Sequence, residues 1–237
     1  MILTTVKNFT VAAEIRPWHF IRHNALFREL PEDIINALVT MARTVRLNDR
    51  VQVHAKGDEP EGMYGIMSGQ VRASSTTVDG REALLAVLEP GVWFGESSLF
   101  DGLPRTYDAY AQGECILLLI PRAPLEALLA QHPVLYRQFV KLLCQRIRLS
   151  LLLQESNGLL ALEGRLANRM LLMANLEQLP SPTLHVSQED LSKMLGTSRQ
   201  SVNKVLKGWE LRQLIRRHYG CITLCNLGEL ERLARAT

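Results

Sequence analysis

Between residues 45 and 120, hydrophobic and polar positions alternate with the period of two that is typical of β-strands. The dipeptide Asp79-Gly80 is a strong hairpin signal between two strand-like segments. Residues 64–73 predict two strands joined by a turn at Ser68-Gly69, and the apolar run at 115–120 is typical of a buried strand. Short strands with regular turn signals indicate a small antiparallel β-roll or jelly roll.

Helical spacing flanks this strand-rich region. A helix is predicted over residues 30–45, with Pro31 at its first helical position and apolar residues three or four apart. A shorter helix is predicted at 124–130. The strands and helices are therefore segregated along the chain, which predicts an α+β fold.

A long helix is predicted over residues 133–162, which contain no internal proline. Leu142, Leu149, Leu153 and Leu160 recur in it at intervals of 7, 4 and 7 residues, as in the seam of a coiled coil. The seam packs either on the roll or against a second copy of the chain. Because this helix is apolar on more than one side, we expect it to do both and to form a homodimer.

Residues 186–209 (VSQEDLSKMLGTSRQSVNKVLKGW) have the most informative pattern in the chain. Ser187 and Asp190 fit a capping box at the start of one helix, and Gly196 stands where a helix end favours a left-handed residue. Ser198 can cap a second helix. The apolar side of that helix consists of Val202, Val205, Leu206 and Trp209, and its polar side of Arg199, Gln200, Asn203 and Lys204. This pattern predicts a helix-turn-helix, whose second helix enters the DNA major groove.

The segments around this motif complete a winged helix-turn-helix. A helix is predicted from Gly164 to about Leu179, followed by a break at 180–182. A hairpin turning at Tyr219-Gly220 predicts the wing, and a last helix is predicted at 227–235. We therefore expect four parts, which are an N-terminal extension (1–25), the β-roll (26–132), the dimerisation helix (133–163) and the DNA-binding domain (164–237).

Charge is distributed unevenly between these parts. Residues 164–237 contain 11 Lys and Arg against 6 Asp and Glu, whereas residues 1–163 contain 16 against 18. The positive excess therefore coincides with the helix-turn-helix, as binding to DNA phosphates requires.

Composition narrows the class of protein. The first 20 residues have no secretory signal pattern, and no stretch approaches the roughly 18 apolar residues of a membrane span. The four cysteines lack zinc-finger spacing. No Walker A, GxSxG or HExxH motif is present, so we expect no enzyme. These features favour a cytoplasmic protein without metal, membrane or catalytic site.

The order of the parts, together with two motifs, resembles the CRP/FNR superfamily of bacterial transcription regulators. Residues 94–106 (FGESSLFDGLPRT) are similar to the superfamily's phosphate-binding cassette, with its Gly-Glu and Pro-Arg elements. Residues 64–71 (YGIMSGQV) are similar to its strand-turn-strand segment, and His132-Pro133 precedes the long helix as in that superfamily. The resemblance runs from about residue 26 to the C-terminus. It implies the roll, dimerisation helix and winged helix-turn-helix in this order.

By this resemblance, the roll would bind a small effector, with the cyclic nucleotides cAMP and cGMP as first candidates. Arg105 would pair with the cyclic phosphate and Thr106 would donate its hydroxyl to it. Glu96 would accept from the ribose 2′-hydroxyl, and Gly95 would leave room for the sugar. Ser150 on the long helix would contact the purine.

An alternative for the roll stays open. In superfamily members that bind no nucleotide, the Gly-Glu turn closes the roll, and the Arg can pair internally with the Glu. Tyr107 and Asp108 stand where nucleotide-binding members favour small residues, and a carboxylate pointing inward would repel a phosphate. No iron–sulfur cluster is expected, because the first cysteine is Cys115 and the iron–sulfur branch has several N-terminal cysteines.

The second helix of the helix-turn-helix supplies the candidate DNA contacts. Arg199 suits a bidentate contact with guanine, and Gln200 a bidentate contact with adenine. Asn203 and Lys204 can reach either a base edge or a phosphate. Contacts to the DNA backbone are expected from the surrounding polar residues, which are Thr197, Ser198, Lys193, Lys207, Arg216, Arg217 and His218.

The sequence thus predicts a homodimeric, effector-responsive regulator that binds a palindromic site on double-stranded DNA and recruits or blocks RNA polymerase. One alternative is a regulator whose roll is structural and binds no ligand. Another is a cyclic-nucleotide-binding regulatory subunit of an enzyme complex, against which the winged helix-turn-helix argues.

Overall fold

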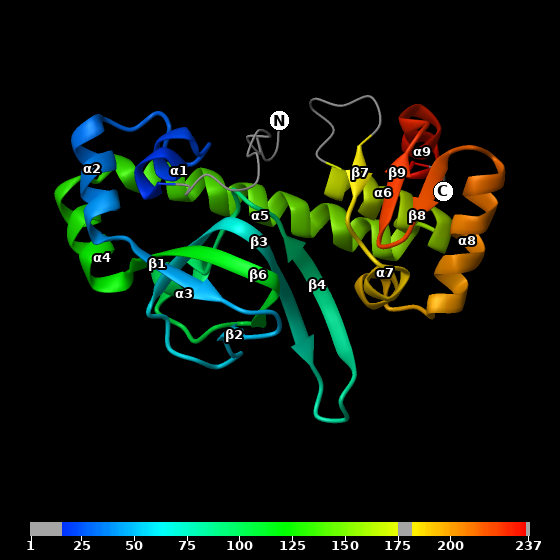
Figure 1. Cartoon of the computed structure of the whole chain (residues 1–237), viewed down its shortest axis with the longest axis horizontal. Helices are drawn as coiled ribbons and strands as arrows, with labels where there is room; N and C mark the ends of the chain where they lie inside the picture. Colours follow the sequence, from blue (N-terminus) through cyan, green and yellow to red (C-terminus); the bar gives the residue numbers. More distant parts are fainter. Residues whose placement is uncertain (1–15, 175–181, 236–237) are drawn as a thin grey trace. The chain divides into compact units, whose positions relative to one another are not determined.

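The computed structural model describes residues 16–174 and 182–235, and within these ranges the chain forms two compact units. The division between them falls after Cys144, inside the long helix α5 (Val134–Leu159). The N-terminal unit contains the strand-rich region, and the C-terminal unit contains the helix-turn-helix (Figure 1).

The N-terminal unit begins with two helices, continues as a roll of strands and ends in helices. Its elements are α1 (Pro17–His23), α2 (Glu32–Met41), β1 (Arg43–Leu47), β2 (Gln52–His54), β3 (Gly62–Thr76), β4 (Glu82–Leu88), β5 (Trp93–Phe94), α3 (Glu96–Asp101), β6 (Asp108–Pro121), α4 (Arg122–Gln131) and the first part of α5. All strand pairs are antiparallel, in the order β1-β6-β3-β4, with β2 on β6 and β5 on β3. The predicted antiparallel roll is confirmed.

Strand β6 separates two buried clusters of side chains. Because successive side chains of a strand point to opposite faces, Leu118 and Ile120 join a cluster with the helices, whereas Leu117 and Leu119 join the interior of the roll. The helical cluster includes Phe139 of α5. Burial on both faces explains why residues 115–120 are a continuous apolar run rather than an alternating one.

The turn predicted at Ser68-Gly69 is not present, because β3 passes through both residues as one strand. Its pairing with β6 shifts register on both sides of Ser68, and Gly69 has a φ of +76°. A Cβ at Gly69 would lie 2.4 Å from the carbonyl oxygen of Glu114. The glycine therefore forms a bulge in a long strand, where a strand passes close to another backbone.

The predicted helix at residues 30–45 is shorter than expected. It ends at Met41, since Arg43 already pairs with Leu119 in the sheet, and Pro31 is its N-cap residue rather than its first helical residue. Pairing with β6 therefore competes with continuation of the helix, and the sheet contact decides the boundary.

The predicted long helix also ends early, because α5 stops at Leu159 and α6 begins at Leu162. Leu142 is buried, so the expected leucine seam does not form one exposed stripe. The apolar residues that are exposed on one face of α5, at spacings of four, three and four, are Val140, Cys144, Ile147 and Leu151. This stripe is an exposed apolar face of α5 that differs from the predicted leucine seam.

The C-terminal unit combines short helices with a three-stranded antiparallel sheet of order β7-β9-β8 (Figure 1). Its elements are α6 (Leu162–Ala174), β7 (Thr183–Leu184), α7 (Gln188–Leu195), α8 (Arg199–Leu211), β8 (Ile215–His218), β9 (Cys221–Leu224) and α9 (Leu227–Leu233). The predicted wing is the β8–β9 hairpin, which the structure confirms. The predicted end of the preceding helix, at Leu179, lies outside the described residues.

One buried cluster holds this unit together. It joins α6, α7, α8 and the sheet through residues such as Leu166, Leu191, Leu206 and Trp209. The apolar sides of both helices of the helix-turn-helix are thereby used for folding, which leaves their polar sides for other contacts. Among the helices in the described part of the chain, none has the length and apolar character needed to cross a membrane.

Candidate nucleic-acid interface and ligand site

Local hydrogen bonds fix the turn between α7 and α8. Ser187 and Asp190 form the expected capping box, in which the Ser187 Oγ accepts from the backbone N–H of Asp190 at 3.0 Å. Gly196 ends α7 in the left-handed conformation. The Ser198 Oγ accepts from the backbone N–H of Ser201 at 3.0 Å and caps α8. The capping residues predicted from the sequence are therefore the ones that form the turn.

Helix α8 has a buried side and an open side. Val202, Leu206 and Trp209 are fully buried against the unit. Most of the candidate DNA-binding residues of the helix are exposed, and these are Ser198, Arg199, Gln200, Lys204 and Lys207. Thr197 and Asn203 are half-buried. The helix thus presents basic and amide groups on one face, with the positive end of the helix dipole adjacent.

The wing strand β8 separates three residues that the sequence analysis grouped together. Arg216 and His218 are exposed, whereas Arg217, on the other side of the strand, is half-buried. The Arg217 guanidinium donates to Glu210 and to Asn203 rather than projecting into solvent. Strand alternation was a signal in the sequence that distinguishes Arg217 from its neighbours.

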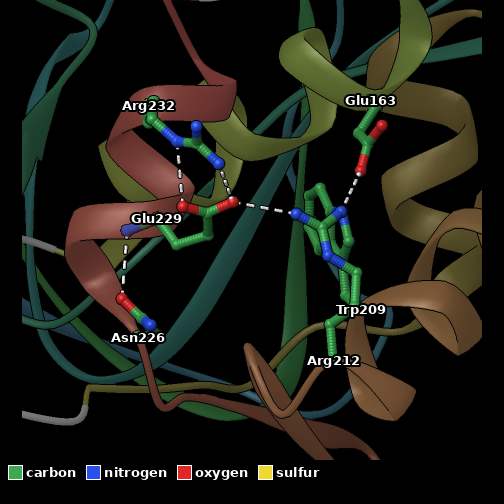
Figure 2. A network of polar contacts seen from close by, with 6 residues as sticks. All are labelled: Glu163, Trp209, Arg212, Asn226, Glu229 and Arg232. Atoms are coloured by element: carbon green, nitrogen blue, oxygen red, sulfur yellow. Dashed lines mark hydrogen bonds and ion pairs between the residues drawn. The ribbon is translucent and has the colours of Figure 1, made fainter.

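A network of polar contacts fixes the C-terminal end of α8 (Figure 2). The Trp209 indole N–H donates to Glu163 at 2.7 Å, and Arg212 donates to the same carboxylate at 3.2 Å. Arg212 also donates to Glu229 of α9 at 2.9 Å, and Glu229 further accepts from Arg232. Glu163 lies in the first turn of α6. The end of the candidate reading helix is therefore tied to both α6 and α9.

The cassette of the roll is built around Arg105. Its side chain is 3% exposed, and its guanidinium donates to the carbonyl oxygens of Gly95 at 2.8 Å and Gly62 at 2.6 Å. Gly95 has a φ of +87°, and a Cβ there would lie 2.6 Å from Arg105 Nη1. The glycine is therefore required by the approach of the arginine, in addition to any role toward a sugar.

The Arg105 guanidinium donates to these two backbone carbonyl oxygens, and the charge of Glu96 also acts on it. Glu96 is buried, at the first turn of α3. Burial lowers the pKa of Arg105, and the negative groups around it, including Glu96, act in the opposite direction. The Arg105 Nε atom is buried without a hydrogen-bond partner among the described residues. An anionic oxygen can satisfy such a donor.

Aromatic rings lie near this arginine, and among them the sequence analysis singled out only Tyr107. The Arg105 Cζ lies 5.9 Å from the centre of the Tyr64 ring, which stacks on Phe94. The His54 ring centre is 5.5 Å from that of Tyr107. Burial, followed by the charge of Arg105, lowers the pKa of His54 to about 4, so the imidazole is neutral near pH 7. Tyr64, Phe94 and His54 come from the separate strands β3, β5 and β2, so no local motif marks them.

The other candidate effector residues are less enclosed. Thr106 is exposed, and Tyr107 is packed against the roll interior. The carboxylate of Asp108 accepts from the backbone N–H of Lys56 at 2.9 Å, which engages one of its oxygens with that loop. Ser150 is exposed on α5 and belongs to the C-terminal unit, so its contact with a purine stays a prediction. Within the described ranges, no group of three or more His, Cys, Asp or Glu residues could hold a metal ion.

Two family models match the chain, one on each side of α5. The cyclic nucleotide-binding domain matches residues 45–132, and the Crp-like helix-turn-helix domain matches residues 164–233. The first match contains the Arg105 cassette, and the second contains α7, α8 and the wing.

Curated relatives match over most of their length. The CRP-like cAMP-activated global transcriptional regulator of Mycobacterium tuberculosis is 29% identical over 220 residues, which cover 89% of this chain and 96% of the relative. The cyclic AMP receptor protein of Thermus thermophilus is 29% identical over 215 residues, which cover 90% of this chain and 98% of the relative.

Solved structures show the same fold. FixK2 from Bradyrhizobium japonicum has a TM-score of 0.75 at 22% identity, covering 83% of this chain and 98% of that one. A transcriptional regulator of the CRP family from Thermus thermophilus has a TM-score of 0.63 at 28% identity, covering 81% of this chain and 97% of that one.

Proposed function

The chain belongs to the CRP/FNR superfamily of transcription regulators, and from this premise we propose that it acts as a cytoplasmic homodimer that binds a palindromic DNA site through α8. The observation that carries this proposal is the two-sided helix α8, with a fully buried apolar side and an exposed side of Arg199, Gln200 and Lys204. The relatives are transcription regulators, and we propose no enzymatic activity.

The dimer is proposed to form along α5. One face of this helix exposes Val140, Cys144, Ile147 and Leu151. Their spacings of four, three and four residues are those that pair two helices in a coiled coil. A two-fold symmetric dimer would present two copies of α8 to half-sites about 34 Å apart, or one DNA turn. On DNA, it would recruit or block RNA polymerase.

Selection from a random double-stranded DNA library tests this function. We expect enrichment of an inverted repeat whose half-sites are about one DNA turn apart, with an affinity that falls steeply as salt increases. An absence of enrichment, together with salt-insensitive behaviour, would contradict DNA binding and favour a cyclic-nucleotide-binding regulatory subunit.

For the roll, we propose a cyclic nucleotide, cAMP or cGMP, as the effector. The match to the cyclic nucleotide-binding domain supports this, as does the buried Arg105 with its unpartnered Nε. Arg105 and Thr106 would hold the phosphate, and Gly95 and Glu96 the ribose. A ligand-free, structural roll is the second candidate, favoured by the two carbonyl contacts that already engage the Arg105 guanidinium.

Titration calorimetry with cAMP and cGMP separates these two candidates. Arg105→Ala removes a buried group that the fold uses, so Thr106→Val, at an exposed position, serves as the variant that keeps the roll intact. Binding that weakens in Thr106→Val would support the effector site. No heat with either nucleotide, in a folded wild-type dimer, would support the structural roll.

A further inference from the structure

Arg217 in the wing makes contacts that its neighbours do not make. Its guanidinium donates from Nε and Nη2 to Glu210 Oε2 at 2.9 and 2.5 Å, and from Nη1 to Asn203 Oδ1 at 3.0 Å. The Glu210 carboxylate also accepts from the backbone N–H of Arg217 at 3.2 Å. The side chain of Arg217 is 21% exposed. This link joins β8 to the helix that carries the candidate base contacts.

We propose that Arg217 is a positioning residue that fixes the side-chain amide of Asn203 and so determines which base edge Asn203 reads. The proposal rests on the proposed DNA-binding function. An arginine side chain has only donors, so the Asn203 atom that faces it must be the amide oxygen. One lone pair of the amide oxygen is therefore engaged by the wing, and the Nδ2 group, with its two donors, is directed away from Arg217.

This orientation of the amide determines which bases Asn203 prefers. A bidentate contact with adenine needs the amide oxygen to accept from N6 while the amide nitrogen donates to N7. With its oxygen engaged and a guanidinium beside it, Asn203 favours base edges that present acceptors in the major groove, namely O6 and N7 of guanine or O4 of thymine. The amino groups of adenine and cytosine are donors and would face the positive charge of Arg217.

The contacts of Arg217 also argue against the role in phosphate binding that its sequence position suggested. Three of its nitrogens donate to protein oxygens, and Glu210 supplies a compensating charge. These hydrogen bonds lower the pKa of the Glu210 carboxyl, which keeps it ionised. Arg216, exposed on the opposite side of β8, is better placed for a phosphate.

The test combines DNA selection with salt-dependent binding of the wild-type protein and its variants. In Asn203→Ala, the selected sequences should lose their base preference at the position that Asn203 reads. This loss identifies the position. In Arg217→Ala, the preference for guanine or thymine at that position should fall about three- to tenfold, the effect of one hydrogen bond, and adenine should gain. The dependence of log affinity on log salt should not change, because no phosphate contact is lost.

Arg216→Ala is the matched control on the same strand. It should lower the salt slope by about one and leave base preferences unchanged. The double variant Asn203→Ala/Arg217→Ala should have the preferences of Asn203→Ala alone, because nothing is left to position. Arg217→Lys keeps the charge but cannot bridge Glu210 and Asn203 in the same way, so it should reproduce the change in preference if Arg217→Ala does not fold.

Each outcome decides between distinct roles. A lower salt slope in Arg217→Ala with unchanged base preference would make Arg217 a phosphate contact and overturn the proposal. If both the base preference and the salt slope are unchanged in Arg217→Ala, its contacts with Glu210 and Asn203 have only a structural role. This outcome would also overturn the proposal. If the wild-type protein enriches no sequence, the proposed DNA-binding function fails instead.

Discussion

Single residues of the same type have opposite roles in this chain because their surroundings differ. Arg199 is exposed at the start of α8, Arg105 is buried among carbonyl oxygens, and Arg217 is held between Glu210 and Asn203. Of these three arginines, Arg199 is the exposed one, so its donors can reach a base edge. Burial also acts on His54, whose imidazole stays neutral inside the roll. Arg199 and His54 each lead to a prediction at the residue scale.

Arg199→Ala should weaken binding to the selected DNA site by about 1–3 kcal/mol and relax the preference at one base pair, because a bidentate contact to guanine is lost. Anisotropy titrations against single-base variants of the site measure both effects. Arg199→Lys is the control that keeps the charge. An equal loss on every sequence would make Arg199 a phosphate contact instead.

The neutral His54 should make the folded roll sensitive to acid. Because its pKa is lowered from 6.5 to about 4 in the folded protein, the unfolded chain binds a proton at intermediate pH that the folded chain does not. Stability from this group is therefore present above pH 6.5 and is lost as pH falls toward 4. Between about pH 7 and pH 5, the loss is on the order of 2 kcal/mol.

Urea unfolding of the wild-type protein and of His54→Phe at these two pH values isolates this contribution. Phenylalanine fits the aromatic surroundings and does not titrate, so the variant should lose less stability on acidification. Equal losses in both proteins would show that His54 is not the group that responds.

At the scale of elements, helix α8 is fixed at both ends by different means. Ser198 caps its start, a contact within one turn of the chain. Its other end is fixed by Trp209 and Arg212 through Glu163 and Glu229, which lie on α6 and α9 (Figure 2). The position of the reading helix therefore depends on residues that do not face DNA.

Glu163→Ala should lower the free energy of unfolding of the C-terminal unit by about 1–3 kcal/mol, because the indole N–H of Trp209, a residue only 1% exposed, loses its acceptor. Glu163→Gln keeps an acceptor and should lose less. Far-ultraviolet circular dichroism during urea unfolding follows the change, because this signal does not depend on Trp209. In Trp209→Phe, where the donor is absent, Glu163→Ala should have a smaller effect; an undiminished effect would exclude the indole contact as its cause.

At the scale of the whole molecule, the proposed function depends on a second copy of the chain. The exposed stripe on α5 is apolar, and a dimer formed along it would place two reading helices on one DNA site. A single copy would contact one half-site and bind weakly. The effector, if it acts through the roll, would have to bind one state of this dimer better than another.

Leu151→Glu should convert the dimer to a monomer and weaken binding to the inverted repeat, because like charges would face each other across the seam. Leu152→Glu is the matched control, since Leu152 is also exposed on α5 but lies on another face. Sedimentation velocity measures the assembly. A dimer that persists in Leu151→Glu would place the interface elsewhere.

Local patterns allowed much of the fold to be predicted from the sequence. The capping box at Ser187, the left-handed Gly196 and the hairpin at Asp79-Gly80 depend on residues within a few positions of each other, and all were predicted correctly. The candidate reading face of α8 followed from helical spacing in the same way. Such features need no knowledge of distant segments, because neighbouring residues alone satisfy them.

Contacts between distant segments were decided only by the tertiary structure. Arg105 donates to a carbonyl 43 positions away, and Arg217 donates to Asn203 and Glu210, which lie on α8. Gly69 forms a bulge because β3 passes close to the backbone of Glu114 there. Leu142 is buried and is therefore not exposed on the predicted seam. The sequence by itself therefore determined most of the elements, their order and the candidate reading face. The tertiary structure decided the partners of Arg105 and Arg217, because a guanidinium shielded from water donates to whichever acceptors the fold brings within reach.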